Sequence, residues 1–447
     1  MAACAFLGLG TPNKSGVTFR RKCCFMSASS SSPLSWARDG GIQWNVMNLH
    51  TFAGNVRGMI AEQDFDASSA IVKVPKEMVL ESNSIPETNP IPSFVTSSYW
   101  KSQRWWVRLA LRLVYQKQTD KKPNLSGYVN ALPKTFSTPF HWTAEELQET
   151  QYIPIQKQVV NQQQEWKRLH RLLTENLKDE RSVEFDEFVW ALECVRSRAF
   201  SGEAEATPFG ERLKTIAFAG ALSVAALTLH LADSEQVLNG LSLAVIALLS
   251  YDLIYPRVQK AIGGEEWKRY ILCPIIDFCN HSSRAESDIS YEYFFSSFVL
   301  KTGPYKKGEQ VFISYGDRSN DQLLQYYGFV EENNPHDVYV VGETLQSVLD
   351  SLDIDSADLS DQEKEYGPVV LFRSTLNFDT SVQKSVSKLF GEEGIKHFAE
   401  QVCLRELENM PTTLEEDEGL KKKSIAVQFR IQKKRLLTDI LKESREQ

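Results

Sequence analysis

The sequence has few cysteines, and their spacing fits neither a zinc cluster nor a disulfide framework. Three of the seven lie within the first 24 residues, and the others are Cys194, Cys273, Cys279 and Cys403. No glycine-rich loop follows a predicted strand, which disfavours a Rossmann-type fold. We therefore expect no metal site and no doubly wound nucleotide-binding sheet.

Acidic residues are absent from the first 38 positions, which hold five basic residues and seven serines. This composition is typical of an organelle transit peptide, and a disordered tail is the alternative. We expect residues 1–38 to be a plastid transit peptide. Without their charges, the net charge of the chain falls from −8 to about −13, which argues against a nucleic-acid-binding protein.

Apolar runs long enough to span a membrane are also missing. Two apolar stretches, 216–231 and 237–251, fall short of the roughly 20 residues that cross a bilayer unaided. Small residues at close spacing would let two such helices pack as a hairpin. A buried helical pair, an interfacial anchor and a short transmembrane hairpin all fit this pattern, so membrane association through 216–251 stays open.

The length and composition indicate a soluble protein with more than one domain. A chain of 447 residues is too long for one compact core, and we expect roughly two or three domains. Apolar residues make up 42% of the sequence and charged residues 24%, which is ordinary for a globular protein.

The most informative stretch runs from 277 to 330. Apolar residues and β-formers alternate over 294–300 and again over 310–315, which predicts two short strands separated by turns. Asn280 and His281 lie upstream, on an expected loop. Tyr315 closes the second strand, so its phenol is expected where a strand edge meets a cleft.

Three sequence motifs in this stretch carry a family resemblance. They read N-H-S at 280–282, G-E-Q-V-F-I-S-Y-G at 308–316 and S-N-x-x-L-L-x-x-Y-G-F at 319–329. In this order and spacing they resemble the C-terminal half of a SET methyltransferase domain. The resemblance implies that the N-H-S segment and the strand that ends in Tyr315 form one pocket.

Two earlier segments extend the resemblance. Residues 56–61 are similar to the first SET motif, G-x-G-x-x-A, with Val56 in place of the first glycine and Ser68-Ser69 in place of a later G-E pair. The phrase W-A-L-E-C-V-R-S-R-A-F-S, at 190–201, resembles the branch that has a large helical insertion and contains the Rubisco large-subunit lysine methyltransferase.

The resemblance implies an α+β fold: a SET-domain β-fold with a large helical insertion, followed by an all-α C-terminal domain. Its expected parts are 42–120 and 271–330 for the two pieces of the SET domain, 121–270 for the insertion with the hydrophobic pair at 215–255, and 331–447 for a helical substrate-binding domain.

The resemblance also implies a set of site residues. Tyr315 is the expected catalytic residue. The cofactor S-adenosylmethionine is expected at Asn55, Val56, Arg57, Gly58, Arg198, Asn280 and His281. The protein substrate is expected at Arg198, Gly202, Asp277, Tyr291, Tyr315 and Tyr327, with Tyr293 as an alternative to Tyr291. Taken alone, Arg198 fits the basic end of a helix equally well.

Methyl transfer from a sulfonium to a lysine amine is an in-line displacement, so the enzyme supplies alignment, a dry site and a neutral amine. Desolvation and the neighbouring positive charge both lower the pKa of the lysine ammonium, and no strong general base is needed. A phenol that orients methyl group and amine is needed, and Tyr315 fits that role.

Helical patterns fill the rest of the chain. We expect helices over 99–117, 156–177, 368–390 and 392–407, and a capping box formed by Thr143 and Glu146. The basic amphipathic segment from about 420 fits either a solvated helix face or a docking site for an acidic protein partner.

These observations together predict a protein-lysine N-methyltransferase of the chloroplast stroma that acts, as a monomer, on a folded plastid protein. Rubisco large subunit and aldolase are the substrates that the resemblance suggests. A catalytically weak SET scaffold that binds a partner, and a protein-histidine methyltransferase, are the alternatives. Val56 and the Ser68-Ser69 pair favour the scaffold, whereas the intact N-H-S motif and Tyr315 favour the enzyme.

Overall fold

The computed structural model describes residues 34–447, except for 45, 68, 84–85, 87, 120–124, 179–180, most of 204–267, 293–295, 374–377 and 447. The apolar stretches 216–231 and 237–251 lie almost wholly outside the described residues. Within the described part of the chain, no helix has both the length and the apolar character needed to cross a bilayer.

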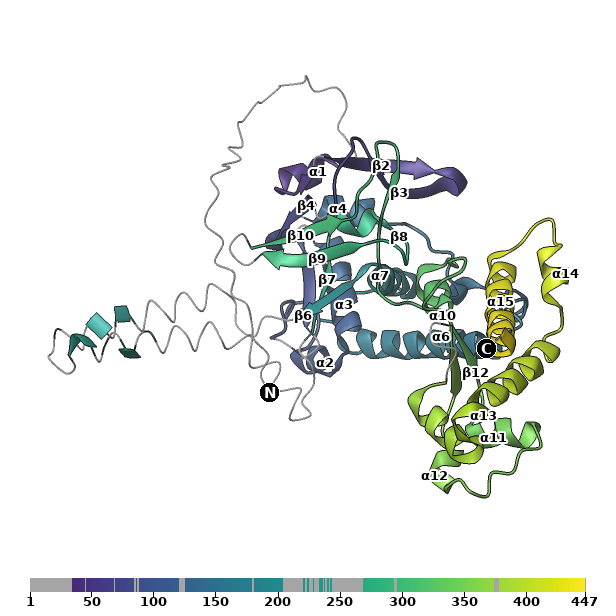
Figure 1. Cartoon of the computed structure of the whole chain (residues 1–447). Coiled ribbons are helices and arrows are strands. Elements are labelled where there is room, and N and C mark those ends of the chain that lie inside the picture. Colours follow the sequence, from purple (N-terminus) through teal and green to yellow (C-terminus); the bar gives the residue numbers. More distant parts are fainter. Residues whose placement is uncertain are drawn as a thin grey trace.

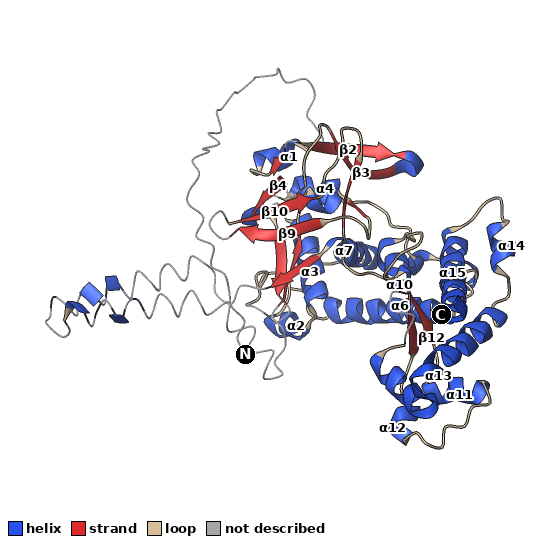
Figure 2. Cartoon of the chain, viewed as in Figure 1, coloured by secondary structure: helices blue, strands red, loops and turns tan. Residues whose placement is uncertain are grey.

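Three sheets form the β part of the molecule (Figures 1 and 2). The first contains, in order, β1 (Gln43–Trp44), β4 (Ser69–Pro75), β10 (Ser297–Thr302) and β9 (Ser287–Glu292). The second contains β2 (Met47–Phe52), β3 (Val56–Ala61), β11 (Gln310–Ile313) and β8 (Asn280–His281). The third contains β5 (Leu80–Asn83), β7 (Lys268–Leu272) and β6 (Phe200–Glu203).

Every one of these sheets joins segments that are far apart in the sequence. Strand β11 pairs antiparallel with β3, where Val311 faces Met59, and parallel with β8, where Ile313 faces His281. Strand β10 pairs antiparallel with β4. The early and late pieces of the predicted SET domain therefore form one unit.

The predicted strands differ from the observed ones mainly at their ends. Strand β10 begins at Ser297 and β11 ends at Ile313, two residues before Tyr315. Asn280 and His281, expected on a loop, form the short strand β8, because the open edge of β11 is available to pair with their backbone.

Helices cover this β part and connect it to the rest of the chain. They are α1 (Ser35–Asp39), α2 (Ser97–Ser102), α3 (Trp105–Gln118), α4 (Ser126–Ala131), α5 (Ala144–Gln148), α6 (Ile153–Thr174) and α7 (Phe185–Arg198). The single helix expected at 99–117 is two helices, because the backbone is extended at Gln103 and Arg104. The capping box of Thr143 and Glu146 is confirmed at the start of α5.

Short helical turns link several of these elements. They are η1 (Ala53–Asn55), η2 (Lys76–Met78), η3 (Pro139–His141), η4 (Ile276–Phe278), α10 (Asn320–Gln322) and the π-helical turn η6 (Leu323–Tyr327). Two of them bear on the site, because η4 carries Asp277 and η6 ends at Tyr327.

The first described residues belong to the folded core. Leu34 and Ala37 are fully buried, and the ring of Trp36 lies 6.1 Å from that of Tyr128. The expected leader, 1–38, therefore overlaps the folded chain by five residues, 34–38.

The C-terminal part has a core of its own, built on β12 (Val338–Val341), β13 (Val369–Phe372), α11 (Leu345–Ser351), α12 (Asp361–Lys364), α13 (Thr380–Glu408), α14 (Leu414–Glu418) and α15 (Ile425–Glu446). It is helical except for the antiparallel pair β12–β13, so the expected all-α domain contains a small sheet. The expected helix from 368 is wrong at its start, since 369–372 pairs as a strand. The break expected near 391 occurs at Gly391, where φ is 71°.

Helix α6 connects the two cores. Ile155 and Val159, near its N-terminus, pack into the C-terminal core, whereas Trp166 and Leu169 pack into the core of the SET part. In Figure 1 this helix extends from beneath the strands toward α15. The expected insertion thus contributes to both parts of the molecule, and the expected domain boundaries stay a prediction.

Three basic residues of α15 follow neither of the two expected patterns, whereas Lys442 is exposed. Arg430, Lys433 and Lys434 are buried, although the segment was expected to present a solvated face or a docking surface. Asp417 accepts from Lys434 Nζ at 2.5 Å and from Arg430 at 2.7 Å. Internal ion pairs therefore fix this helix.

We expect Asp417→Ala to lower the free energy of unfolding by about 3–5 kcal/mol, because it leaves two buried cations without their carboxylate. Urea denaturation followed by circular dichroism measures this change. Asp358→Ala, at an exposed position of the same C-terminal part, is the control and should change stability by less than about 0.5 kcal/mol. Equal effects of the two variants would contradict the assigned role.

Candidate functional site

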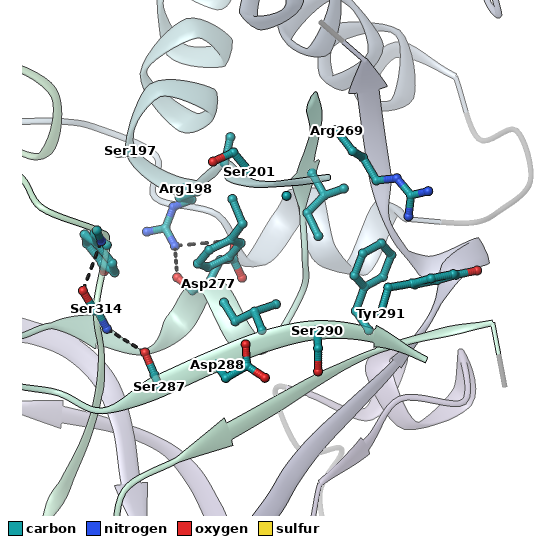
Figure 3. A pocket seen from close by; sticks show the side chains of 18 of the residues that line it. Ser197, Arg198, Ser201, Arg269, Asp277, Ser287, Asp288, Ser290, Tyr291 and Ser314 are labelled. Carbon is teal, nitrogen blue, oxygen red and sulfur yellow. Dashed lines mark hydrogen bonds and ion pairs between the residues drawn. The ribbon is translucent and has the colours of Figure 1, made fainter. Parts of the chain in front are cut away.

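A cavity of about 680 Å³ opens between α7, β6, β9 and the end of β11. All six residues expected to bind the substrate line it: Arg198, Gly202, Asp277, Tyr291, Tyr315 and Tyr327. Tyr293, the alternative to Tyr291, lies outside the described residues. Figure 3 shows Arg198 pointing toward Asp277 on one side of the cavity, and Tyr291 next to Arg269 on the other.

A buried ionic network lies at the inner side of the cavity. Arg198, at the C-terminus of α7, donates to the Asp277 carbonyl at 2.6 Å and lies 3.7 Å from its carboxylate. The Tyr128 phenol donates to the same carboxylate at 2.6 Å. Arg198 therefore binds the η4 turn and does more than end a helix.

The Asp277 carboxyl is strongly perturbed. Burial raises its pKa to about 6, while Arg198 and the Tyr128 hydrogen bond oppose that rise. Asp277 Oδ1 and Arg198 Nε are both buried without a hydrogen-bond partner among the described residues. Two polar atoms thus remain available to a ligand.

Tyr315 lies between the cavity and the N-H-S segment. Its phenol donates to the Cys279 carbonyl at 2.9 Å, and its backbone N–H donates to His281 Nδ1 at 3.0 Å. Its ring stacks on Tyr327, with 5.0 Å between centroids. Burial raises the pKa of Tyr315, so the phenol stays protonated at neutral pH. Gly316 follows with φ of 89°, a conformation that lets the chain turn at once.

The imidazole of His281 lies between the backbone of Tyr315 and the carboxylate of Glu331. Nδ1 accepts from the Tyr315 backbone, and Nε2 lies 3.4 Å from the Glu331 carboxylate. Burial lowers the pKa of His281, which favours the neutral ring. The ring is therefore fixed through Nδ1, whereas Nε2 is buried without a hydrogen-bond partner among the described residues.

The segment 55–58, which contains Gly58 and is called the cofactor strip below, lies beside Asn280. The Asn280 amide donates to the Arg57 carbonyl at 3.2 Å. A Cβ at Gly58 would come within 2.5 Å of Asn280 Nδ2 and 2.8 Å of Gln310 Nε2, so a side chain there would displace these two amides. The Arg57 guanidinium lies over the ring of Phe278 at 5.4 Å.

Val56, at the start of β3, has 49% of its surface exposed. Asn55 ends the η1 turn just before it, and its side chain lies outside the described part. The expected cofactor residues thus lie together along β3 and β8. Arg198, on α7, lines the cavity, whereas the other six expected cofactor residues are not among those that line it.

Solved structures with the same architecture include the SET domain of LSMT bound to methyllysine and AdoHcy. Its TM-score is 0.59 at 17% identity, over 94% of this chain and 92% of that one. The structure of Rubisco LSMT bound to AdoMet gives a TM-score of 0.56 at 18% identity, covering 93% and 91%.

The chain therefore has a SET-domain fold. Human SET domain-containing protein 4 is 25% identical to it, over 75% of this chain and 68% of that protein. The chloroplastic fructose-bisphosphate aldolase-lysine N-methyltransferase of Arabidopsis thaliana is 24% identical, over 86% and 76%. The chloroplastic Rubisco large subunit N-methyltransferase of Nicotiana tabacum is 22% identical, over 86% and 74%. No protein-family model matches the chain.

Several residues of this SET-domain site were not predicted from the sequence. Tyr128 lies 149 residues before Asp277, in a short helix without any recognisable motif. Arg318 donates to the Tyr315 carbonyl at 3.2 Å, and Arg269 lies over the Tyr291 ring at 5.0 Å. Only Arg318 had a local signal, since it sits within the stretch that the resemblance covers.

The raised pKa of Asp277 gives a pH-dependent stability. Between its usual pKa of 3.8 and about 6, the folded chain holds a proton that the unfolded chain has released. Stability from this group is therefore complete below the lower value and is lost as the pH rises through the higher one.

We expect wild type to lose about 1 kcal/mol of unfolding free energy relative to Asp277→Asn between pH 5 and pH 7. Urea denaturation at several pH values measures the difference. Asp358→Asn, at an exposed site, should follow the wild-type profile. Parallel profiles for wild type and Asp277→Asn would show that Asp277 has no raised pKa in the folded chain.

Proposed function

We propose that this SET-domain protein is an S-adenosylmethionine-dependent protein-lysine N-methyltransferase. The observation that carries the proposal is the position of Tyr315. Its ring forms part of the cavity wall, while its backbone and phenol bind the N-H-S segment at His281 and Cys279. One residue therefore joins the acceptor cavity to the expected cofactor strip.

The residues present fit the proposed cofactor. A side chain at Gly58 would displace the Asn280 amide, which lies beside it. The unpartnered Arg198 Nε and Asp277 Oδ1 offer one buried donor and one buried acceptor. We propose that Asn280, His281 and 55–58 hold S-adenosylmethionine, with Arg198 reaching it from the cavity. The bound cofactor would supply a methyl group on a sulfonium.

The cavity itself would prepare the acceptor amine. Its aromatic walls, Tyr291, Tyr315 and Tyr327, exclude water, and desolvation lowers the pKa of a lysine ammonium placed there. The Arg198 guanidinium adds a nearby positive charge that acts in the same direction. The Tyr315 phenol stays protonated, so we assign it the orientation of the amine and not the removal of a proton.

The structure weakens the case for a silent scaffold. The β3 strand keeps its pairing with β2 and β11 although Val56 replaces the first glycine of the motif. Ser69 lies in β4 and pairs with Thr302 of β10, so loss of the G-E pair leaves the sheet intact there. Position 68 lies outside the described residues.

The chemical class of acceptor is a separate question. The actin-histidine N-methyltransferase of Danio rerio is 23% identical to this chain, over 69% of it and 43% of that protein. The aldolase-lysine N-methyltransferase of Arabidopsis thaliana, which is named for lysine methylation, covers more of the chain, 86%. This coverage favours lysine.

We further propose a plastid protein as the substrate, with the helical part, 331–447, as its docking region. Both plant relatives carry the word chloroplastic in their names, and those names specify aldolase and the Rubisco large subunit. A stromal location, a monomeric state and membrane association through 216–251 stay predictions.

The first test is Tyr315→Phe, which removes the phenol and its bond to Cys279 while keeping the ring. We expect turnover to fall roughly 10²-fold, as when one preorganised donor is lost from an active site. Affinity for S-adenosylmethionine, measured by calorimetry, should change less than about twofold. The matched control is Tyr305→Phe, whose phenol also binds backbone, at Phe312, but lies outside the cavity. An unchanged rate would remove Tyr315 from its assigned role.

The second test is direct transfer of label. The chain beginning at Leu34 is incubated with methyl-labelled cofactor and a plastid stromal extract, and labelled peptides are sequenced by mass spectrometry. We expect Nε-methyllysine in one or a few stromal proteins. Methylhistidine would select the alternative acceptor, and a protein that binds no S-adenosylmethionine would select the scaffold.

A further inference from the structure

Lys433 of α15 is buried beneath the segment that leads to the acceptor cavity. Its ammonium donates to the Asp321 carboxylate, to Asp337 at 2.9 Å and to the Val338 carbonyl at 2.7 Å. The ring of Phe429 lies 5.1 Å from the ammonium. An ion pair between Lys433 and Asp321 thus connects the C-terminal helix α15 to α10.

Asp321 is part of a continuous rigid turn. Helix α10 runs directly into η6, a π-helical turn that ends at Tyr327, and Gly328 follows with φ of 77°. Such turns are rare and occur often at functional sites. Six residues therefore separate the carboxylate that binds Lys433 from the phenol that lines the cavity.

Asn320 locks the beginning of this turn. Its backbone N–H and side-chain amide donate to the two carboxylate oxygens of Asp337, at 3.0 and 2.9 Å. Its side chain also exchanges hydrogen bonds with the backbone of Glu331. Asp337 thus binds Lys433 and Asn320 together, so the ammonium faces both carboxylates that hold the turn.

The other contacts of the turn come from the SET side and from α6. Gln325 donates to Gln162 of α6 at 2.9 Å, and the Arg196 guanidinium lies 4.0 Å over the ring of Tyr326. Leu324 also belongs to the hydrophobic cluster of the C-terminal part, and the ion pair adds a buried polar contact with α15 to that packing.

We propose that Lys433 is a positioning residue for the acceptor site: through Asp321 and Asp337 it sets the turn 320–327 and thereby the Tyr327 ring against Tyr315. The inference rests on the proposed function, because it concerns the same cavity. It makes the acceptor site depend on the seating of α15, more than 100 residues along the chain from Tyr327.

Lys434 is the natural control. It is buried as completely as its neighbour and pairs with Asp417 at 2.5 Å, but its other contacts are with Thr412, Thr413 and Gln151. None of these belongs to the turn or the cavity. Loss of Lys433 removes the ammonium from Asp321 and Asp337, and loss of Lys434 leaves Asp417 only its pair with Arg430. Both variants are expected to lose stability, and only Lys433→Met is expected to disturb Tyr327.

The test measures binding of Nε-methyllysine by calorimetry, in the presence of S-adenosylhomocysteine, two molecules found together on the SET domain of LSMT. Lys433→Met should weaken methyllysine binding roughly tenfold, within the range of coupled neighbours, and leave S-adenosylhomocysteine binding within about twofold. Lys434→Met should leave both affinities at the wild-type level. Equal methyllysine affinities for the two variants would overturn the inference.

A double-mutant cycle shows whether the effect passes through Tyr327. In a Tyr327→Ala background, Lys433→Met should weaken methyllysine binding no further, since the positioned ring is gone. If Lys433→Met weakens methyllysine binding by the same factor with and without the Tyr327 ring, the inference is overturned. If Lys433→Met does not fold, Asp321→Asn replaces it and Asp417→Asn replaces its control, with the same expected contrast.

These measurements distinguish a failure of the positioning role from a failure of the proposed function. A wild-type protein that binds S-adenosylhomocysteine and methyllysine, with affinities insensitive to Lys433→Met, would overturn the positioning role alone. A wild-type protein that binds neither molecule would overturn the proposed function, and the positioning role with it.

Discussion

The site depends on the pairing of one short strand on both of its edges. Strand β11 has β3 on one side and β8 on the other, so in one sheet it lies between the early segment that contains Gly58 and the late N-H-S segment. The strand ends at Ile313, which faces His281 of β8, and Tyr315 follows two residues later. The bonds from Tyr315 to His281 and Cys279 then fix the aromatic wall of the cavity.

A second constraint is the burial of the Asp277 carboxyl among charged groups. Asp277 is buried among Arg198, Tyr128 and the Arg57 guanidinium, and its pKa stays near 6 despite these partners. Holding a carboxylate there costs stability at neutral pH, which is typical of a site arranged for a ligand and not for rigidity. The C-terminal part uses the opposite arrangement, in which buried ammonium groups are matched by carboxylates and secure α15.

The sequence predicted those features that are local or carried by a motif. The substrate set came from the resemblance, and its six residues line one cavity although they span 198 to 327. Contacts between distant segments were not predictable: Tyr128 meets Asp277 from a short helix without a signature, and the buried lysines of α15 looked like a solvated stripe. A periodicity identifies a helix face, but burial of a lysine depends on acids elsewhere in the chain. The pair β12–β13 was missed because a four-residue apolar run fits a helix equally well.

The claim that unites these findings is that the cofactor strip and the acceptor cavity meet at Tyr315. A crystal structure of the chain with S-adenosylhomocysteine and Nε-methyllysine tests it most directly. The account predicts the nucleoside along β3 and β8, and the methylated amine in the cavity beside the Tyr315 phenol. An amine bound elsewhere, or a nucleoside separated from it by intact protein, would contradict the account.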